Sequence, residues 1–236
     1  MPSVLITGAN RGIGLELARQ YAADGWAVHA CCRHPQAADA LRALGGDVTV
    51  HRMDVDEPTE IAAVAAELGA TPLDLLINNA GIIDNYGVGV AEGKDDPDIR
   101  TYDFGLWEQV MRTNLYAPAR MTGAFLANLA KADRPVVVMV GSGLSSIANT
   151  RQGGRYAYRT SKAALNMLTR GFAAWLEPEG VIVVSIAPGW TRTDLGGPSA
   201  PNPVDRSVAG MRKTIAGLTM EKTGTYWDWD GKSLPW

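Results

Sequence analysis

The chain has 236 residues, of which 46% are hydrophobic and 20% are charged, and its formal net charge is −3. This balance predicts a soluble globular protein that can bury a full core in one domain. The sequence has no cluster of Lys and Arg that would attract nucleic acid, and no run of about 18 apolar residues that would span a membrane. A small molecule is therefore the expected partner.

Short apolar runs alternate with longer segments of helical periodicity along the whole chain. The runs that predict strands are SVLIT (3–7), AVHACC (27–32), VTVHRMDV (48–55), LDLLINNA (73–80), PVVVMVGS (135–142) and GVIVVSIAPG (180–189). Helices are predicted over 15–24, 36–44, 58–68, 104–131 and 156–177. Continuous apolarity is typical of parallel strands that are covered on both faces. The alternation predicts an α/β fold, a Rossmann-type doubly wound parallel sheet in a single domain over 1–236.

Two segments interrupt this alternation, and both follow a predicted strand. Residues 84–103 are polar and rich in glycine, and residues 190–210 are rich in proline. Ligands of open parallel sheets bind beyond the carboxyl ends of the strands, and long loops there often cover the ligand. We therefore expect these segments to be substrate loops.

The cysteines and histidines give no sign of a metal site. Cys31 and Cys32 are adjacent inside an apolar run and match neither a disulfide nor a metal-ligand spacing, and His29, His34 and His51 are scattered. Buried thiols in a reducing compartment are the expectation. The first residues, MPSVLITGAN, lack a basic segment before an apolar one, so no secretory signal is expected and the predicted location is cytoplasmic.

A glycine-rich turn joins the first predicted strand to the first predicted helix. It reads Thr7, Gly8, Ala9, Asn10, Arg11, Gly12, Ile13, Gly14. Glycines in this context permit a tight turn, a close approach of the backbone to a pyrophosphate and close packing of helix on strand. Backbone N–H groups at the start of the helix then bind the phosphates. The turn predicts dinucleotide binding because it lies between a strand and a helix of an α/β pattern.

The stretch YAYRTSK at 156–162 contains two tyrosines and one lysine. Side chains four residues apart share a helix face, so Tyr158 lies beside Lys162, whereas Tyr156 has Thr160 at that spacing. A cation beside a phenol favours the phenolate and lowers its pKa. Tyr158 and Lys162 are therefore predicted to be a general acid/base and the group that tunes it. The alternative is an exposed Tyr–Lys pair on a helix surface.

Four motifs together resemble the short-chain dehydrogenase/reductase family. They are Thr7-Gly8-x-x-x-Gly12-x-Gly14, Asn78-Asn79-Ala80-Gly81, Tyr158-x-x-x-Lys162 and Pro188-Gly189, in the order the family has them and across nearly the whole chain. YAYRTSKAALN and the segment GTYWDWDGKSLPW are similar to the carbonyl-reductase and C-factor-like (sniffer-like) branch. The resemblance implies a Rossmann fold and hydride transfer, and it says little about the substrate.

The family places a serine at the end of the fifth strand, beside the tyrosine, to bind the substrate oxygen. Ser142 follows that strand directly, with Gly141 where the family has another serine. Counting back from Tyr158 by the commonest family spacing would choose Ser145, but NTRQGGR reads as a longer loop in this branch. Ser142 is the predicted residue, and Ser145 and Ser146 are expected to cap the following turn.

Asn114 lies on an apolar stripe of the helix predicted over 104–131. Pro118, four residues later, has no N–H, so the Asn114 carbonyl loses its helical donor and the helix is expected to kink. The resemblance implies that this carbonyl holds a water that links the lysine to solvent. A proline-kinked packing helix is the alternative.

The resemblance also assigns the remaining cofactor contacts. Asp54 and Val55 would lie near the adenine; Asn79, Ala80 and Gly81 along the adenine ribose; Tyr158 and Lys162 at the nicotinamide ribose; and Pro188, Gly189 and Thr193 at the carboxamide. The alternatives are an ordinary strand-end turn for the asparagine motif and a helix start for Thr193.

The second strand predicts the choice of cofactor. Enzymes that use NAD commonly place a carboxylate at its end to bind the ribose 2′-OH. Here Arg33 follows AVHACC, and a guanidinium can bind the oxygens of a 2′-phosphate in pairs. Arg11, in the glycine turn, would approach the same phosphate. The prediction is NADP(H) in preference to NAD(H). The alternative is that both arginines are solvated cations on loops and bind no phosphate.

The sequence therefore predicts an NADP-dependent oxidoreductase that moves hydride between nicotinamide and a carbonyl or alcohol carbon of a small apolar or aromatic substrate. Trp190, Tyr86 and Tyr102 are candidates for the wall of its pocket, although such residues also simply pack. A second hypothesis is an NADP(H)-binding regulatory protein of the C-factor type with little turnover, and the intact Tyr158–Lys162 pair weighs against it. A cofactor-free dehalogenase on this fold is disfavoured by Lys162 and by the glycine turn. A homodimer or homotetramer is compatible with all of these.

Overall fold

The computed structural model describes residues 1–84 and 98–236. The strands are β1 (Ser3–Thr7), β2 (Ala27–Cys32), β3 (Val48–Arg52), β4 (Leu75–Asn78), β5 (Val136–Val140), β6 (Ile182–Ala187) and β7 (Tyr226–Asp228). The α-helices are α1 (Gly12–Ala23), α2 (Asp39–Arg42), α3 (Pro58–Leu68), α4 (Phe104–Met111), α5 (Ala117–Leu129), α6 (Tyr156–Leu176) and α7 (Val204–Ala216). Short helices are η1 (Pro35–Ala37), η2 (Ile99–Thr101), η3 (Arg112–Tyr116), η4 (Gly143–Ser145), η5 (Glu177–Glu179) and η6 (Met220–Lys222).

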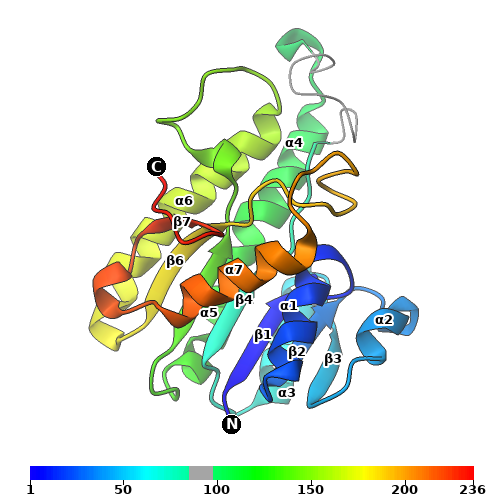
Figure 1. Ribbon diagram of the computed structural model, residues 1–236, viewed down its shortest axis with the longest axis vertical. Helices are drawn as coiled ribbons and strands as arrows, with labels where there is room; N and C mark the ends of the chain where they lie inside the picture. The colour runs from blue at the N-terminus through cyan, green and yellow to red at the C-terminus, as the bar shows by residue number, and fades with distance from the viewer. Residues whose placement is uncertain (85–97) are drawn as a thin grey trace.

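The described strands form one parallel sheet in the order β3-β2-β1-β4-β5-β6-β7 (Figure 1). The predicted Rossmann-type doubly wound sheet is thus confirmed. The order reverses direction between β1 and β4, and such a switch point is where this architecture binds ligands.

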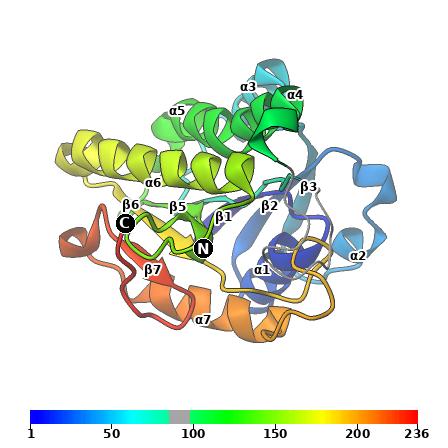
Figure 2. The same cartoon turned by 90° about the horizontal axis from the view of Figure 1, so that it is seen from above.

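Helices cover both faces of the sheet, as the view from above shows (Figure 2). Neighbouring strand residues point to opposite faces. Ile6 packs with α1 and α7 on one side, whereas Leu5 packs with α3, α5 and α6 on the other. Phe125 of α5 is fully buried, and burying a side chain of this size stabilises a fold by roughly 2–3 kcal/mol. Each helix in the described ranges falls short of the length or the apolarity that crossing a lipid bilayer requires.

The structure corrects several predicted boundaries. The helix predicted over 104–131 is divided into α4, a π-helical segment over 112–116 and α5, because Pro118 removes the donor that a continuous α-helix needs. The helix predicted over 36–44 is two short pieces, η1 and α2.

The carboxyl-terminal third also differs from the prediction. The segment 190–210 is a loop only as far as Pro203, because α7 begins at Val204. β7 was not predicted, since YWD is short and lacks an apolar run; it forms by pairing with the exposed edge of β6. Most of the loop predicted over 84–103, including Tyr86, lies outside the described residues.

A chain of ionisable side chains bridges β2 and β3. His29 Nδ1 lies 3.2 Å from His51 Nε2, and His51 Nδ1 lies 2.8 Å from Glu67 Oε2. Burial lowers the pKa of His29 below its usual value; the neighbouring His51 adds to this shift, and Asp47 opposes it. The fold therefore favours neutral His29.

This shift predicts a loss of stability in mild acid. An unfolded histidine titrates near pH 6.5, so protons bind the unfolded chain first as the pH falls below about 6.5. The free energy of unfolding should fall through that range and level off below the folded pKa. His29→Gln should weaken this pH dependence in urea titrations between about pH 7.5 and about pH 5.5, whereas the exposed His34→Gln should leave it unchanged. Identical pH dependence in the parent protein and His29→Gln would contradict the assignment.

Candidate active site

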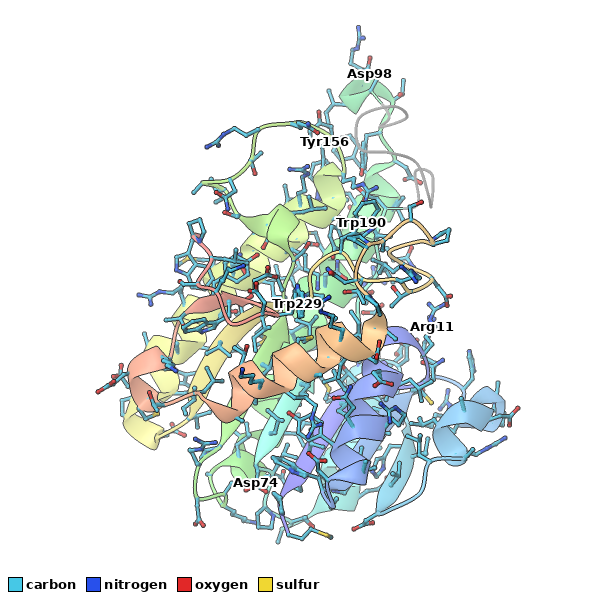
Figure 3. The ribbon with its side chains drawn as sticks, viewed as in Figure 1. Arg11, Asp74, Asp98, Tyr156, Trp190 and Trp229 are labelled. Atoms are coloured by element: carbon cyan, nitrogen blue, oxygen red, sulfur yellow. The ribbon has the colours of Figure 1, made fainter. Side chains whose placement is uncertain are left out.

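A cleft of about 460 Å³ opens at the carboxyl ends of the strands. This is the end of the molecule that carries Arg11, Trp190 and Tyr156, opposite Asp74 (Figure 3). The predicted cofactor residues that line it are Gly8, Asn10, Arg11, Gly12, Ile13, Gly14, Arg33, Asp54, Val55, Asn79, Ala80, Gly81, Tyr158, Lys162, Pro188 and Thr193. Gly189 adjoins this wall without lining it, and the cleft brings together residues that lie between Gly8 and Leu195 in the chain.

The glycine turn and the end of β4 are joined by side-chain hydrogen bonds. The Thr7 hydroxyl accepts from the backbone N–H groups of Asn79 and Ala80, each at 3.0 Å. Asn79 Nδ2 in turn donates to the carbonyl of Thr7 at 2.8 Å. A Cβ on Gly14 would lie 2.2 Å from the Gly8 carbonyl oxygen, so only glycine permits this approach.

The same turn meets the requirements of a dinucleotide pyrophosphate. Gly8 and Gly12 have φ values of +65° and +53°, in the region that favours glycine. The helix α1 begins at Gly12, so its first N–H groups, which have no intrahelical partner, face the cleft. The residues present therefore fit a nicotinamide dinucleotide.

Two arginines border this part of the cleft. Arg33 is exposed on its wall at the end of β2. Arg11 Nη1 lies 3.1 Å from Asp194 Oδ2 on the loop after β6, and both side chains are largely exposed. An exposed ion pair of this kind contributes about 0–1 kcal/mol, so Arg11 can leave Asp194 at little cost.

Tyr158 and Lys162 lie on one face of α6 and are both buried, with exposed fractions of 8% and 4%. The Lys162 ammonium lies 6.0 Å from the centre of the Tyr158 ring and donates to the Val140 carbonyl at 2.7 Å. Burial lowers the pKa of Lys162 to about 8. The surface-pair alternative for Tyr158 and Lys162 is therefore excluded.

The pKa of Tyr158 differs from the sequence-based expectation. Burial raises it above its usual value, while the nearby Ser142 side chain and the charge of Arg155 oppose that shift. Lys162 was expected to lower the pKa of Tyr158, but its ammonium is turned to the carbonyl of Val140. Ser142 and Arg155, rather than Lys162, are the neighbours that favour the phenolate in this structure.

The three candidate serines have different surroundings. Ser142 Oγ accepts from Leu144 N at 3.2 Å, and Ser142 is the serine that lowers the pKa of Tyr158. Ser145 Oγ is buried and donates to the Ser142 carbonyl at 2.6 Å, and Ser146 Oγ donates to the Pro235 carbonyl at 2.7 Å. Of the three, Ser142 is the one placed beside the phenol, as the strand boundary predicted.

Asn114 is fully buried in the π-helical segment. Its Oδ1 accepts from Ile82 N at 2.9 Å, while its Nδ2 donates to the Ile82 carbonyl at 2.8 Å and to Ser161 Oγ at 3.0 Å. The side chain thus joins η3, the segment after β4 and α6. A Cβ on Gly81 would lie 3.2 Å from Asn114 Oδ1 and 3.5 Å from Lys162 Nζ, so the asparagine and the lysine meet at this glycine.

Sequence reasoning missed Asp84 and left open whether Tyr102 lines the pocket or simply packs. Tyr102 was a candidate for the pocket wall, but it is buried and donates a hydrogen bond to Asp84 Oδ2. Asp84 is 3% exposed, and its charge raises the pKa of Tyr158. Asp84 lies shortly after the Asn-Asn-Ala-Gly motif, which was the available signal. Trp190, by contrast, is 58% exposed.

The comparisons with known proteins agree with this geometry. The family model described as short chain dehydrogenase matches residues 2–203. The chain belongs to the short-chain dehydrogenase family. Its similar proteins include C-signal of Myxococcus xanthus, which is 40% identical over 174 residues, covering 74% of this chain and 99% of that protein.

Solved structures of this family superpose on the whole chain. The carbonyl reductase Sniffer of D. melanogaster has a TM-score of 0.90 at 31% identity, with 100% of each chain covered. The NADPH-bound carbonyl reductase from chicken fatty liver has a TM-score of 0.88 at 33% identity, covering 100% of this chain and 99% of the other. The similarity to the carbonyl-reductase and C-factor-like branch is therefore confirmed.

The position of Asp84 predicts a measurable shift of the Tyr158 pKa. Asp84→Asn removes a negative charge that disfavours the phenolate, so the pKa of Tyr158 should fall but stay above its usual value, because burial is the larger cause. Carbon-13 NMR of tyrosine Cζ, assigned with Tyr158→Phe, would measure the shift. The exposed Asp133→Asn should leave it unchanged. A Tyr158 pKa that stays the same or rises in Asp84→Asn would contradict the prediction.

Proposed function

We propose that this short-chain dehydrogenase is an NADP-dependent carbonyl reductase that acts on a small apolar or aromatic carbonyl compound or the corresponding alcohol. The observation that carries the proposal is the buried Tyr158 phenol, whose pKa the Ser142 side chain lowers and which shares the cleft with Lys162. The raised pKa keeps this phenol protonated at neutral pH, so it holds a proton that can be transferred. NADP-bound carbonyl reductases among the structural relatives support this choice.

The protein residues in this proposal bind, orient and move a proton. The bound nicotinamide supplies the hydride. The Tyr158 hydroxyl gives its proton to the carbonyl oxygen of the substrate, and Ser142 Oγ donates a hydrogen bond to that oxygen. The Lys162 ammonium holds the ribose hydroxyls and, once turned toward the phenol, stabilises the phenolate that proton transfer leaves. The Asn114 carbonyl accepts from a water that returns a proton by way of Lys162.

The cofactor preference rests on the end of β2. Arg33 follows Cys32 there, on the wall of the cleft, and β2 ends without a carboxylate for a ribose 2′-OH. Arg33 and Arg11 would bind the 2′-phosphate of NADP(H) between them, Arg11 leaving Asp194. Asp54 and Val55 would line the adenine pocket, and Pro188, Gly189 and Thr193 would meet the carboxamide.

The similarity to C-signal supports a second candidate function. A regulatory protein that binds NADP(H) with little turnover would keep the same cleft. The burial of Tyr158 and Lys162 in the cleft favours the enzyme, because cofactor binding alone does not require a proton donor beside a lysine.

We also propose a cytoplasmic homo-oligomer, either a homodimer or a homotetramer. Burial raises the pKa of the Cys31 thiol, which keeps it protonated and suits a reducing compartment. Phe104 and Tyr116, on the outer side of α4 and η3, are 60% and 51% exposed beside a hollow of about 470 Å³. Exposed aromatic side chains around a hollow favour an interface.

Tyr158→Phe keeps the ring and removes the transferred proton. Turnover of a panel of aldehydes and ketones with NADPH should fall by at least about a hundredfold, while NADPH binding, measured by fluorescence, is retained. Tyr156→Phe is the matched control two residues away and should lose little. Full turnover in Tyr158→Phe would contradict the proposed mechanism, and a parent protein that binds NADPH but reduces no member of the panel would favour the regulatory alternative.

Arg33→Asp tests the cofactor choice. The carboxylate should repel the 2′-phosphate and accept from a 2′-OH, so the preference for NADPH should shrink or reverse, chiefly through KM for the cofactor. Steady-state kinetics with both cofactors measure the ratio of kcat/KM. Arg192→Asp, on the loop after β6, is the charge-matched control. Equal kcat/KM for NADPH and NADH in the parent protein would contradict the proposal.

A further inference from the structure

The carbonyl oxygen of Ser142 is held by three donors. Ser145 N donates to it at 2.8 Å and Ser145 Oγ at 2.6 Å. The third donor is the hydroxyl of Tyr226, which comes from β7. Three hydrogen bonds to one carbonyl fix the peptide plane that carries Ser142, and with it the direction in which the serine side chain leaves the backbone.

The donors behind this carbonyl form a directional chain through the core. Ser185 Oγ on β6 donates to Asn166 Oδ1 at 2.9 Å, and Asn166 Nδ2 on α6 donates to Ser145 Oγ at 2.8 Å. Ser145, Asn166, Ser185 and Tyr226 are each at most 4% exposed. A buried network in which each hydroxyl proton has an acceptor is rigid, because breaking any member leaves a polar group without a partner.

The ring of Tyr226 is in contact with Trp236. The ring of Trp236 stacks on that of Tyr226, with centroids 5.3 Å apart and an interplanar angle of 19°. The Trp236 carbonyl accepts from Ala148 N at 3.0 Å, which ties this residue to the loop after Ser142. Burial raises the pKa of Tyr226 to about 12, so its hydroxyl remains a donor at any working pH.

The network also explains a departure from the family pattern. Gly141 stands where the family has a serine, and a Cβ there would lie 2.5 Å from Ser185 Oγ and 3.5 Å from Tyr226 Cε2. The hydroxyl of Ser185 therefore fills the space that a side chain at position 141 would need. A side chain at position 141 and this network are therefore sterically incompatible.

We propose that Tyr226 is a positioning residue for the reaction: through the Ser142 carbonyl it sets the Ser142 hydroxyl against the substrate oxygen and the Tyr158 phenol. The inference rests on the proposed function, in which Ser142 binds that oxygen. Tyr226 contacts neither substrate nor cofactor in this scheme and acts only through Ser142.

Tyr226→Phe keeps the ring and its stacking on Trp236 but removes the hydrogen bond to the Ser142 carbonyl. We expect kcat to fall by about threefold to tenfold, the effect of one hydrogen bond, with KM for the cofactor unchanged. A double-mutant cycle with Ser142→Ala gives the decisive comparison, because Tyr226→Phe should cost nothing once the Ser142 hydroxyl is absent. Tyr21→Phe, at a buried tyrosine on α1, is the matched control for removing a buried hydroxyl.

Hydrogen exchange supplies a measurement that does not depend on turnover. Peptides that cover 141–150 should exchange faster in Tyr226→Phe than in the parent protein, and not in Tyr21→Phe. Two results would overturn the positioning role: a loss of kcat from Tyr226→Phe that is the same with Ser142 present as in the Ser142→Ala variant, or unchanged exchange in 141–150. Full turnover in Ser142→Ala would instead refute the role of Ser142 in the proposed function, and the inference with it.

Discussion

The Thr7 hydroxyl accepts hydrogen bonds from two successive backbone N–H groups at the end of β4. These two hydrogen bonds connect the glycine turn to the asparagine motif on the wall of the cleft. The connection is possible because Gly14 lets α1 approach the turn after β1 more closely than any Cβ would permit. Both features lie where the strand order reverses, so the turn, the asparagine motif and the start of α1 face one space.

The reacting groups are held from two sides. On one side, the Asn114 amide accepts from the backbone N–H of Ile82 and donates to the Ile82 carbonyl. The same amide also donates to Ser161 of α6. On the other, three hydrogen bonds hold the Ser142 carbonyl. Tyr158 stands between these supports on a helix of 21 residues. Rigid support of this kind lets a site be preorganised, since groups already in position need no reordering when the substrate binds.

Local rules were sufficient for most of the fold. Continuous apolar runs predicted β1, β2, β4, β5 and β6. Strands that are buried on both faces have apolar residues at successive positions, so each strand stands out in the sequence as an unbroken apolar segment. Because Pro118 has no N–H, the sequence predicted a kink of the helix near Asn114. The structure has a π-helical segment there instead of a simple kink. The prediction missed β7 because three residues with two aromatic rings carry no local strand signal, and it extended the loop after β6 into α7 because prolines precede that helix.

The amino-acid sequence by itself determined the fold class, the glycine turn and the spacing of Tyr158 and Lys162, since each depends on residues close together along the chain and on helix or strand periodicity. Ser142, by contrast, was predicted through the resemblance to the family. Only the tertiary structure decided the environment of these groups. Burial raises the pKa of Tyr158 and lowers that of Lys162, and Asp84, Tyr226 and Ser185 reach the site from distant elements. The reason is physical: pKa values and buried hydrogen-bond networks depend on what packs around a group, and no local pattern records which segments will meet there.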